Sequence, residues 1–196
     1  TELIMKETQN LGPKGLGSDV KGELIKAGCA LYEERGFDSV SLREIAERAG
    51  VNQAMVRYYF KDKLGFETAM LDGGFEKLIT VLAEGDDFQS STQAAISLMN
   101  TMPWMPILIM RTVYVSDTLR AHFIEKHASR LRALLMNKFE PPAGLNPAFV
   151  VMSVIALIAF PQLARPAVSQ IFNLQFDDQF AADYAAYMTA LFAARE

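Results

Sequence analysis

Residues 41–63, SLREIAERAGVNQAMVRYYFKDK, restrict the possible folds of this chain more than any other stretch. Ser41 followed three residues later by Glu44 is a capping box, which marks the start of a helix. Gly50 stands where a left-handed residue ends that helix, and Asn52 is a good N-cap for the next one. A helix, a four-residue turn and a second helix form a helix-turn-helix, whose second helix enters the major groove of DNA.

The apolar residues of the second helix are expected to gather on one side. Val51, Val56 and Phe60 fall at a helical spacing and can form its buried face. The residues left pointing away from that face are Gln53, Ala54, Arg57 and Tyr58.

The same stretch resembles the DNA-binding signature of the TetR (tetracycline-repressor) family of transcriptional regulators. Arg57 stands where that family most often has Tyr, and Tyr59 stands where it often has His, so the base preference does not follow by analogy. The features shared with the family are Ser41, Arg43, Ile45-Ala46, Ala49-Gly50-Val51, Asn52, Val56, Tyr58-Tyr59-Phe60 and Lys63.

The resemblance implies two kinds of DNA contact. Arg can bind O6 and N7 of guanine and Gln can pair with adenine, so these side chains read bases. The residues that would face base edges are Arg43, Gln53, Ala54 and Arg57. The residues that would lie near the sugar–phosphate backbone, which positions the protein without reading sequence, are Ser41, Asn52, Met55, Tyr58, Tyr59, Lys61 and Lys63. Tyr59 has a second interpretation, packing beneath the helix.

The sequence predicts an all-α chain with three parts. Residues 1–17 are polar and glycine-rich and are expected to form a flexible arm, whose Lys6 and Lys14 either touch DNA or belong to a plain terminal tail. Residues 18–64 form a three-helix DNA-binding domain with a first helix capped by Ser18 or Asp19. Residues 65–196 form a helical ligand-binding and dimerisation domain, joined to the first by a long helix.

That long helix is expected from a cap at Asp62 to about Glu84, with Gly73-Gly74 in its middle. The glycine pair is either a hinge or a point of close helix packing. Further helices are expected at about 91–101, 107–115 (buried), 117–139, 147–160 and 178–194. The helix at 147–160 is apolar on almost every side and therefore suggests a subunit interface. The resemblance implies that the last two helices pair with their copies in a homodimer that binds a palindromic operator.

A small-molecule effector is the second expected partner. Many methionines and aromatic side chains suit an adaptable apolar cavity, although most of them can equally be plain core. His122, Tyr114 or Arg111 would be the polar anchor. The candidate ligand-binding residues are Met70, Phe75, Met99, Met102, Trp104, Met105, Met110, Tyr114, His122 and Phe123.

Little in the sequence favours catalysis, a cofactor or a metal. His122 and His127 are five residues apart and so are not expected to share a helix face as a zinc-binding pair would. The single cysteine, Cys29, forbids an internal disulfide. No signal peptide or membrane-spanning run is recognised, which predicts a cytoplasmic protein that contacts no membrane. The net charge of −4 lies after residue 64, and the part before it is neutral, which argues against indiscriminate coating of nucleic acid.

Two other classes of protein remain open at this point. One is a helical small-molecule-binding dimer without DNA-binding activity, which would lack basic and base-reading residues in 41–63. The other is an enzyme, which would need a clustered acid, base or metal site. The sequence favours a ligand-responsive repressor over both, and it does not give the effector, the operator or the target genes.

Overall fold

The computed structural model describes residues 19–138 and 146–193, and the regular elements in these two ranges are all helical, as predicted. The predicted arm at residues 1–17 lies outside them. The helices are α1 (Val20–Arg35), α2 (Leu42–Ala49), α3 (Gln53–Phe60), α4 (Lys63–Glu84), α5 (Phe88–Asn100), α6 (Trp104–Tyr114), α7 (Asp117–Phe123), a π-helical segment (Ile124–Ala128), α8 (Ser129–Lys138), α9 (Pro147–Leu163), α10 (Arg165–Phe172) and α11 (Asp178–Ala193).

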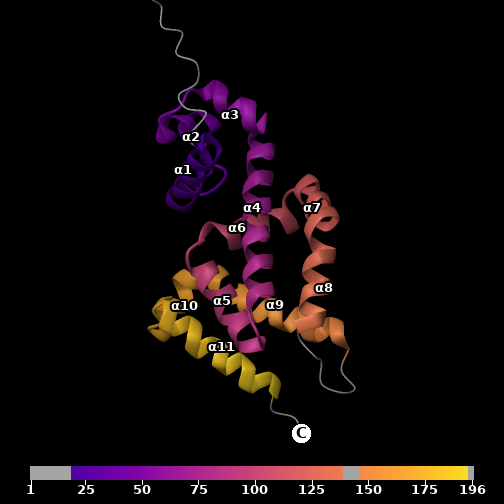
Figure 1. The fold of residues 1–196 in the computed structure, drawn as a ribbon. Coiled ribbons are helices and arrows are strands. Elements are labelled where there is room, and N and C mark those ends of the chain that lie inside the picture. Colours follow the sequence, from indigo (N-terminus) through magenta and orange to yellow (C-terminus); the bar gives the residue numbers. More distant parts are fainter. Residues whose placement is uncertain (1–18, 139–145, 194–196) are drawn as a thin grey trace, which may run out of the picture.

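Helix α4 is the axis of the molecule (Figure 1). Helices α1, α2 and α3 lie at one end of it, and α5, α9, α10 and α11 lie toward the other. Helices α7 and α8 run beside α4. One hydrophobic core runs from Leu24 and Ile45 in the first helices through Phe66 and Met70 of α4 to Leu108 of α6. The core is therefore continuous across the predicted boundary at residue 64.

The three-helix unit (α1–α3) forms around the caps that the sequence predicts. The side chain of Asp19 caps α1, the capping box of Ser41 and Glu44 begins α2, and Asn52 caps α3. Gly50 ends α2 in the left-handed conformation, with φ 67°. Because a side chain is disfavoured there, glycine fixes the turn between the two helices.

Two helix predictions need correction. Helix α5 begins at Phe88 rather than Ser91, because Asp87 and Ser90 form a capping box three residues earlier than expected. Helix α6 begins at Trp104, and the segment 107–115 is not buried as predicted. Its apolar side chains are split between the core and the surface: Leu108 is buried, whereas Tyr114 is 73% exposed.

Helix α4 is continuous through the glycine pair at its middle. A Cβ added at Gly74 would lie 3.2 Å from Met105 Sδ and 3.2 Å from Trp104 Cη2, whereas nothing lies within 4 Å of one added at Gly73. Gly74 therefore permits the close packing of α6 that was one of the two interpretations. The hinge interpretation stays open for Gly73.

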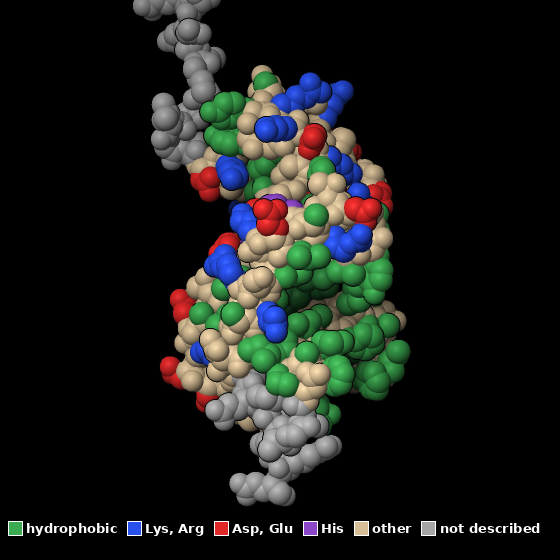
Figure 2. Space-filling model, turned by 90° about the vertical axis from the view of Figure 1, so that its right-hand side faces the viewer, with side chains coloured by type: hydrophobic (Ala, Val, Ile, Leu, Met, Phe, Trp, Pro, Cys, Tyr) green, Lys and Arg blue, Asp and Glu red, His purple; other side chains and the backbone are tan. Residues whose placement is uncertain are grey.

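Helices α9, α10 and α11 expose apolar side chains. Pro161 does not end α9, which continues to Leu163, and α10 follows as a helix that the sequence analysis did not predict. Hydrophobic side chains gather around a hollow on the half of the molecule away from α1–α3 (Figure 2). We call the exposed apolar set on α9 and α10 the apolar face: Phe149, Met152, Ile155, Phe160, Leu163, Ile171 and Phe172.

No single described helix is both long and apolar enough to cross a membrane; α9 and α10 reach that length and composition only as a pair, and they meet at a bend of 80°.

Candidate nucleic-acid interface

The outward face of α3 carries the residues that the sequence predicts. Gln53, Ala54, Arg57 and Tyr58 are exposed. Val56 and Phe60 are buried in the core, which fixes the orientation of the helix. Val51, expected on the buried face, is only half-buried, as is Met55.

Tyr58 and Tyr59 extend the exposed surface of α3. Their rings meet edge to face, with centroids 5.1 Å apart. Tyr59 is 38% exposed, so it does not pack beneath the helix. Aromatic hydroxyls at this position can donate to phosphate oxygens.

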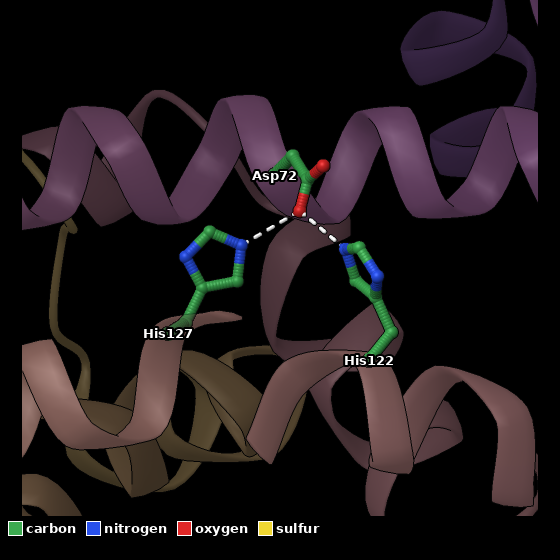
Figure 3. Close-up of side chains that lie close together, drawn as sticks. All are labelled: Asp72, His122 and His127. Carbon is green, nitrogen blue, oxygen red and sulfur yellow. Dashed lines mark hydrogen bonds and ion pairs between the residues drawn. The ribbon is translucent and has the colours of Figure 1, made fainter. Parts of the chain in front are cut away.

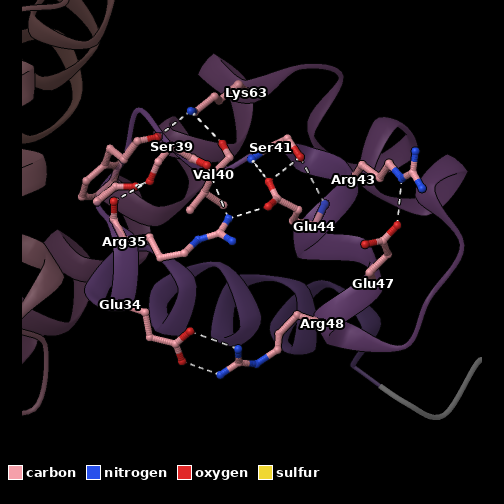
Figure 4. Close-up of polar contacts among 12 residues, drawn as sticks. Glu34, Arg35, Ser39, Val40, Ser41, Arg43, Glu44, Glu47, Arg48 and Lys63 are labelled. Atoms are coloured by element: carbon pink, nitrogen blue, oxygen red, sulfur yellow. Dashed lines mark hydrogen bonds and ion pairs between the residues drawn. The ribbon is translucent and has the colours of Figure 1, made fainter.

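Helix α2 presents Arg43 beside α3 (Figure 4). Its Nε donates to Glu47 Oε1 at 2.8 Å, and both side chains are largely exposed. Because an exposed ion pair of this kind contributes little, it can give way when Arg43 meets DNA. Ser41 is occupied in the capping box, where Glu44 N donates to its hydroxyl.

Helices α1 and α2 are joined by two further ion pairs (Figure 4). Arg48 donates to Glu34 at 2.6 and 3.2 Å, and Arg35 Nη2 donates to Glu44 Oε1 at 2.5 Å. The Arg35 guanidinium and the bonds from Ser41 hold the pKa of Glu44 at about 2. These contacts fix α2 on α1 and so set the position of the turn.

Lys63 is placed differently from the prediction. Its ammonium is half-buried and donates to the carbonyl oxygens of Phe37 at 2.5 Å and Val40 at 2.8 Å. Two satisfied carbonyl bonds make Lys63 a support for the loop before α2 in this structure. Lys61 is exposed with φ 66° and is the better placed cation at the end of α3.

Arg111 also has a structural task that the sequence analysis missed. From α6 it donates to Asp38 Oδ1 at 2.7 Å, in the loop after α1, and to Glu67 Oε2 at 3.1 Å on α4. Glu67 is buried. Arg111 therefore links the three-helix unit to the rest of the molecule and is not free as the polar anchor of an effector.

The candidate ligand-binding residues do not form one cavity. Met70, Met102 and Trp104 line a groove of about 800 Å³ between α1 and α4, together with Asp72 and Lys126. Met110 and Tyr114 lie on the exposed side of α6, and Phe123 packs against Phe75 with ring centroids 4.8 Å apart. The remaining buried candidates, Met99 and Met105, belong to the core. His122 contacts Asp72, a residue that the sequence analysis did not single out.

A family model described as "Bacterial regulatory proteins, tetR family" matches residues 24–66. The chain is 32% identical over 82 residues to "Probable HTH-type transcriptional regulator YttP" of Bacillus subtilis (strain 168), an alignment that covers 40% of each protein. It is 40% identical over 57 residues to "HTH-type transcriptional regulator BetI" of Proteus mirabilis (strain HI4320), covering 29% of this chain and 28% of that protein. The alignments therefore span less than half the length of these relatives.

Solved structures resemble the fold over most of the chain. A "Putative TetR-family transcriptional regulator" from Syntrophomonas wolfei superposes with a TM-score of 0.67 at 13% identity, covering 90% of this chain and 96% of that one. The transcriptional regulator FadR from Bacillus subtilis, solved in complex with stearoyl-CoA, gives 0.64 at 14% identity and covers 90% of this chain and all of that one. At these identities the likeness is one of fold.

Proposed function

We propose, from the match of residues 24–66 to the tetR family of bacterial regulatory proteins, that the protein is a ligand-responsive transcriptional regulator that binds a palindromic operator as a homodimer. The observation that carries the proposal is the outward face of α3. It combines two base-reading side chains with flanking aromatic and basic ones, on a helix whose opposite face is locked into the core.

The base-reading part of the proposal rests on Gln53 and Arg57. Among the described residues, neither side chain makes a hydrogen bond or ion pair, so both are available to DNA. Each good bidentate contact discriminates against a wrong base by about 1–3 kcal/mol. Arg43 supplies a third candidate contact from α2, and the hydroxyls and cations around it would position the helix on phosphates.

The dimer part rests on the apolar face. A set of large apolar side chains on two adjacent helices is unfavourable in water and marks an interaction surface. A second copy of this chain is the natural occupant, because a two-fold axis then places two α3 helices on the two halves of a palindrome. Helices α9 and α11 correspond to the predicted dimerisation helices, and α10 extends the surface.

The effector part rests on the groove between α1 and α4. Its lining combines apolar side chains such as Met70, Met102 and Trp104 with seven charged ones, which suits a small molecule with an apolar part and a charged end. Stearoyl-CoA, bound by the structural neighbour FadR, is a ligand of this kind. An effector that prefers one spacing of the two α3 helices over another would change operator affinity by that difference and no more.

The test compares full-length protein binding to a labelled fragment from upstream of its own gene with binding to random DNA, at several salt concentrations. Tight binding that prefers the upstream fragment and weakens with salt supports the proposal. A selection from random-sequence DNA identifies an operator that lies elsewhere. Failure of that selection to enrich any sequence contradicts DNA recognition and favours a dimer that only binds small molecules.

The decisive variant is Gln53→Ala with Arg57→Ala. We expect sequence preference to fall about 30-fold or more, since two contacts of 1–3 kcal/mol are removed. The matched control is Gln89→Ala with Arg132→Ala, which removes the same side chains from exposed positions on α5 and α8. Equal preference in the two double variants would refute the assignment of α3 as the reading helix.

A further inference from the structure

Helix α7, the π-helical segment Ile124–Ala128 and helix α8 follow one another without a gap, and we call them together the α7–α8 helix. The π-helical segment changes which side chains share a face of this helix. In an α-helix, with 3.6 residues per turn, positions five apart point in different directions. In a π-helix the hydrogen bond runs from residue i to residue i+5, so position i+5 lies nearly above position i. The prediction that His122 and His127 do not share a face is therefore wrong, because the helix between them is not an α-helix.

Both histidines point at Asp72 on α4 (Figure 3). His122 Nε2 lies 2.8 Å and His127 Nε2 lies 2.7 Å from the same oxygen, Asp72 Oδ1. One ligand atom from each of the three side chains lies within 4.8 Å of the other two. His127 is fully buried, His122 is 31% exposed and Asp72 is 23% exposed. The cluster is thus mostly enclosed but reachable from solvent.

Hydrogen bonding within the cluster leaves one polar atom unexplained. His127 Nδ1 is buried and has no hydrogen-bond partner. The nearest carboxylate oxygen, Glu76 Oε1, is 3.9 Å away. A metal-bound histidine characteristically donates its other ring N–H to a carboxylate. Glu76 Oε1, which also accepts from Arg130 Nη1 at 2.5 Å, would have to approach by about 1 Å to accept that bond if Nε2 of His127 is the metal-binding atom.

We propose that Asp72, His122 and His127 bind a divalent transition-metal ion, with Zn²⁺ the best match. Two imidazole nitrogens and one carboxylate oxygen are ligands that Zn²⁺ takes at about 2.0–2.2 Å. A tetrahedral ion at these distances needs its ligand atoms a little more than 3 Å apart. Asp72 Oδ1 must then move about half an ångström further from each Nε2 atom, and the two Nε2 atoms, which lie within 4.8 Å of each other, must reach the same separation. The fourth position is left for water or a small ligand.

The surroundings of the site fit a bound cation. Asp72 Oδ2 accepts from Lys126 Nζ at 2.6 Å, which leaves Oδ1 for the ion and orients the carboxylate. The rings of Phe75 and Phe123 stack on His127, with centroids 5.4 and 6.2 Å from it, and hold the imidazole in place. Asp72, Glu76 and Lys126 also line the groove beside α4, so the fourth position adjoins open space.

The rest of the chain offers little competition for such a metal. The sequence contains two histidines and one cysteine, and both histidines lie in the site. Cys29 lies on α1, and burial raises the pKa of its thiol to about 12, which disfavours the thiolate that binds metal. Imidazole ligation of a metal by this protein can therefore come only from His122 and His127.

The site also has a structural consequence. An ion held by Asp72 and the two histidines would tie α4 to the α7–α8 helix at one point. Because the ion binds the folded chain and has no preformed site in the unfolded one, it raises stability. This inference does not depend on the proposed DNA binding, and its test uses no DNA.

The test uses the full chain without an affinity tag, stripped with a chelator and dialysed. Titration calorimetry with Zn²⁺ is expected to give one ion per chain, and Co²⁺ is expected to produce the visible absorption of a low-coordinate complex. Nitrogen NMR of the two imidazoles is expected to show both Nε2 atoms shifting and His127 carrying its proton on Nδ1.

The variants are Asp72→Asn and His122→Ala, with Glu125→Gln as the control. His122 is chosen because it is partly exposed, whereas His127 is buried and its loss can unfold the chain. We expect at least tenfold weaker binding in the first two variants and unchanged binding in the control, whose side chain is exposed on the same π-helical segment. Glu76→Gln is expected to weaken binding about 10–100-fold through His127. Absent binding in the wild-type protein, or equal binding in His122→Ala, Asp72→Asn and Glu125→Gln, overturns the proposal.

Discussion

The three-helix unit and the helices that carry the apolar face differ in what they leave exposed. The unit packs on α4 around a core that it shares with α4 and α6, and the large outward residues of α3 are polar or aromatic with a hydroxyl. Helices α9 and α10 instead expose Phe149 and Phe172, each by 65%. The unit is therefore complete within one chain, whereas the apolar face is stable in water only when something covers it.

This difference indicates which sequence signals determine the exposed surface of each region. Short-range caps at Asp19, Ser41 and Asn52 define the helices of the unit, so the side chains that they turn outward follow from local sequence. No comparable signal selects the partner of the apolar face, which depends on area and shape. In the function proposed above, DNA binds the outward face of α3 and a second copy of the chain covers the apolar face.

Charges placed on the apolar face should have the largest effect of the variants considered, because they should weaken the proposed dimer. Phe149→Asp with Met152→Asp removes two side chains whose burial contributes about 1.5–3 kcal/mol each, so we expect the dimer to dissociate at least about 100-fold more readily. Sedimentation measures the dissociation constant. Ala83→Asp with Ala133→Asp adds the same charge at exposed positions of α4 and α8 and should leave the dimer unchanged. A dimer that survives the first pair of substitutions places the interface elsewhere.

The second largest effect is expected at Arg111 of α6, whose ion pairs with Asp38 and Glu67 form the joint between the three-helix unit and the rest of the molecule. Arg111→Met leaves the buried carboxylate of Glu67 without its partner, and we expect the free energy of unfolding to fall by about 3 kcal/mol in urea titrations. Asp38→Asn breaks the exposed half of the same link and should cost no more than about 1 kcal/mol. Similar losses in both variants would show that the link to Asp38, not Glu67, holds the joint.

The two glycines of α4 give a smaller effect of opposite sign. Gly73→Ala should raise the free energy of unfolding by about 0.5–1 kcal/mol, because alanine is the better helix former and nothing obstructs its methyl group. Gly74→Ala should lose that gain against Met105 and Trp104. Thermal unfolding compares the two. A Gly73→Ala protein with altered DNA affinity would support a hinge at this position, and unchanged affinity would leave the close packing of α6 on Gly74 as the only role found for the pair.

The smallest expected effect is on how the stability of the three-helix unit depends on pH in acid, through Glu44. Since Arg35 and Ser41 hold the pKa of Glu44 near 2, below the ordinary 4.5, its contribution to stability is fully present above about pH 4.5 and is lost as the pH falls toward 2. Glu44→Gln should therefore flatten the dependence of the unfolding temperature on pH in that window. Glu125→Gln on the π-helical segment serves as the control. Identical pH profiles for wild type and Glu44→Gln would show that the capping box does not couple to folding.

Much of the fold was predictable because its signals are local. Capping residues placed α1 to α4. The outward face of α3 followed from the predicted burial of Val56 and Phe60, although Val51, predicted with them, is only half-buried. The start of α5 was missed because the capping box of Asp87 and Ser90 was not recognised in the sequence. The burial of 107–115 was misjudged because an apolar run does not tell a core face from a surface that a partner covers.

The site residues divide in the same way. Gln53 and Arg57 lie on the outward face of α3, where the spacing predicted them. Lys63 was predicted to lie near the DNA backbone and Arg111 was one of three candidate anchors for the effector, but both side chains contact the chain itself. Those contacts join residues far apart in sequence, such as Arg111 with Asp38, and no local pattern encodes them. The contacts of Asp72 with His122 and His127 were not predicted for the same reason.

The π-helical segment has a further consequence for the ancestry of the cluster. A π turn accommodates one residue more than an α-turn, so it can be regarded as a single-residue insertion in the α7–α8 helix. Deleting one residue from 124–126 would restore an ordinary helix with the two histidines four residues apart, and residues four apart in an α-helix share a face. A related chain could therefore bring the same three side chains together either with histidines four apart in an α-helix or with histidines five apart across a π turn. The hydrogen-bond pattern of the helix and the spacing of the histidines together decide whether the three side chains meet.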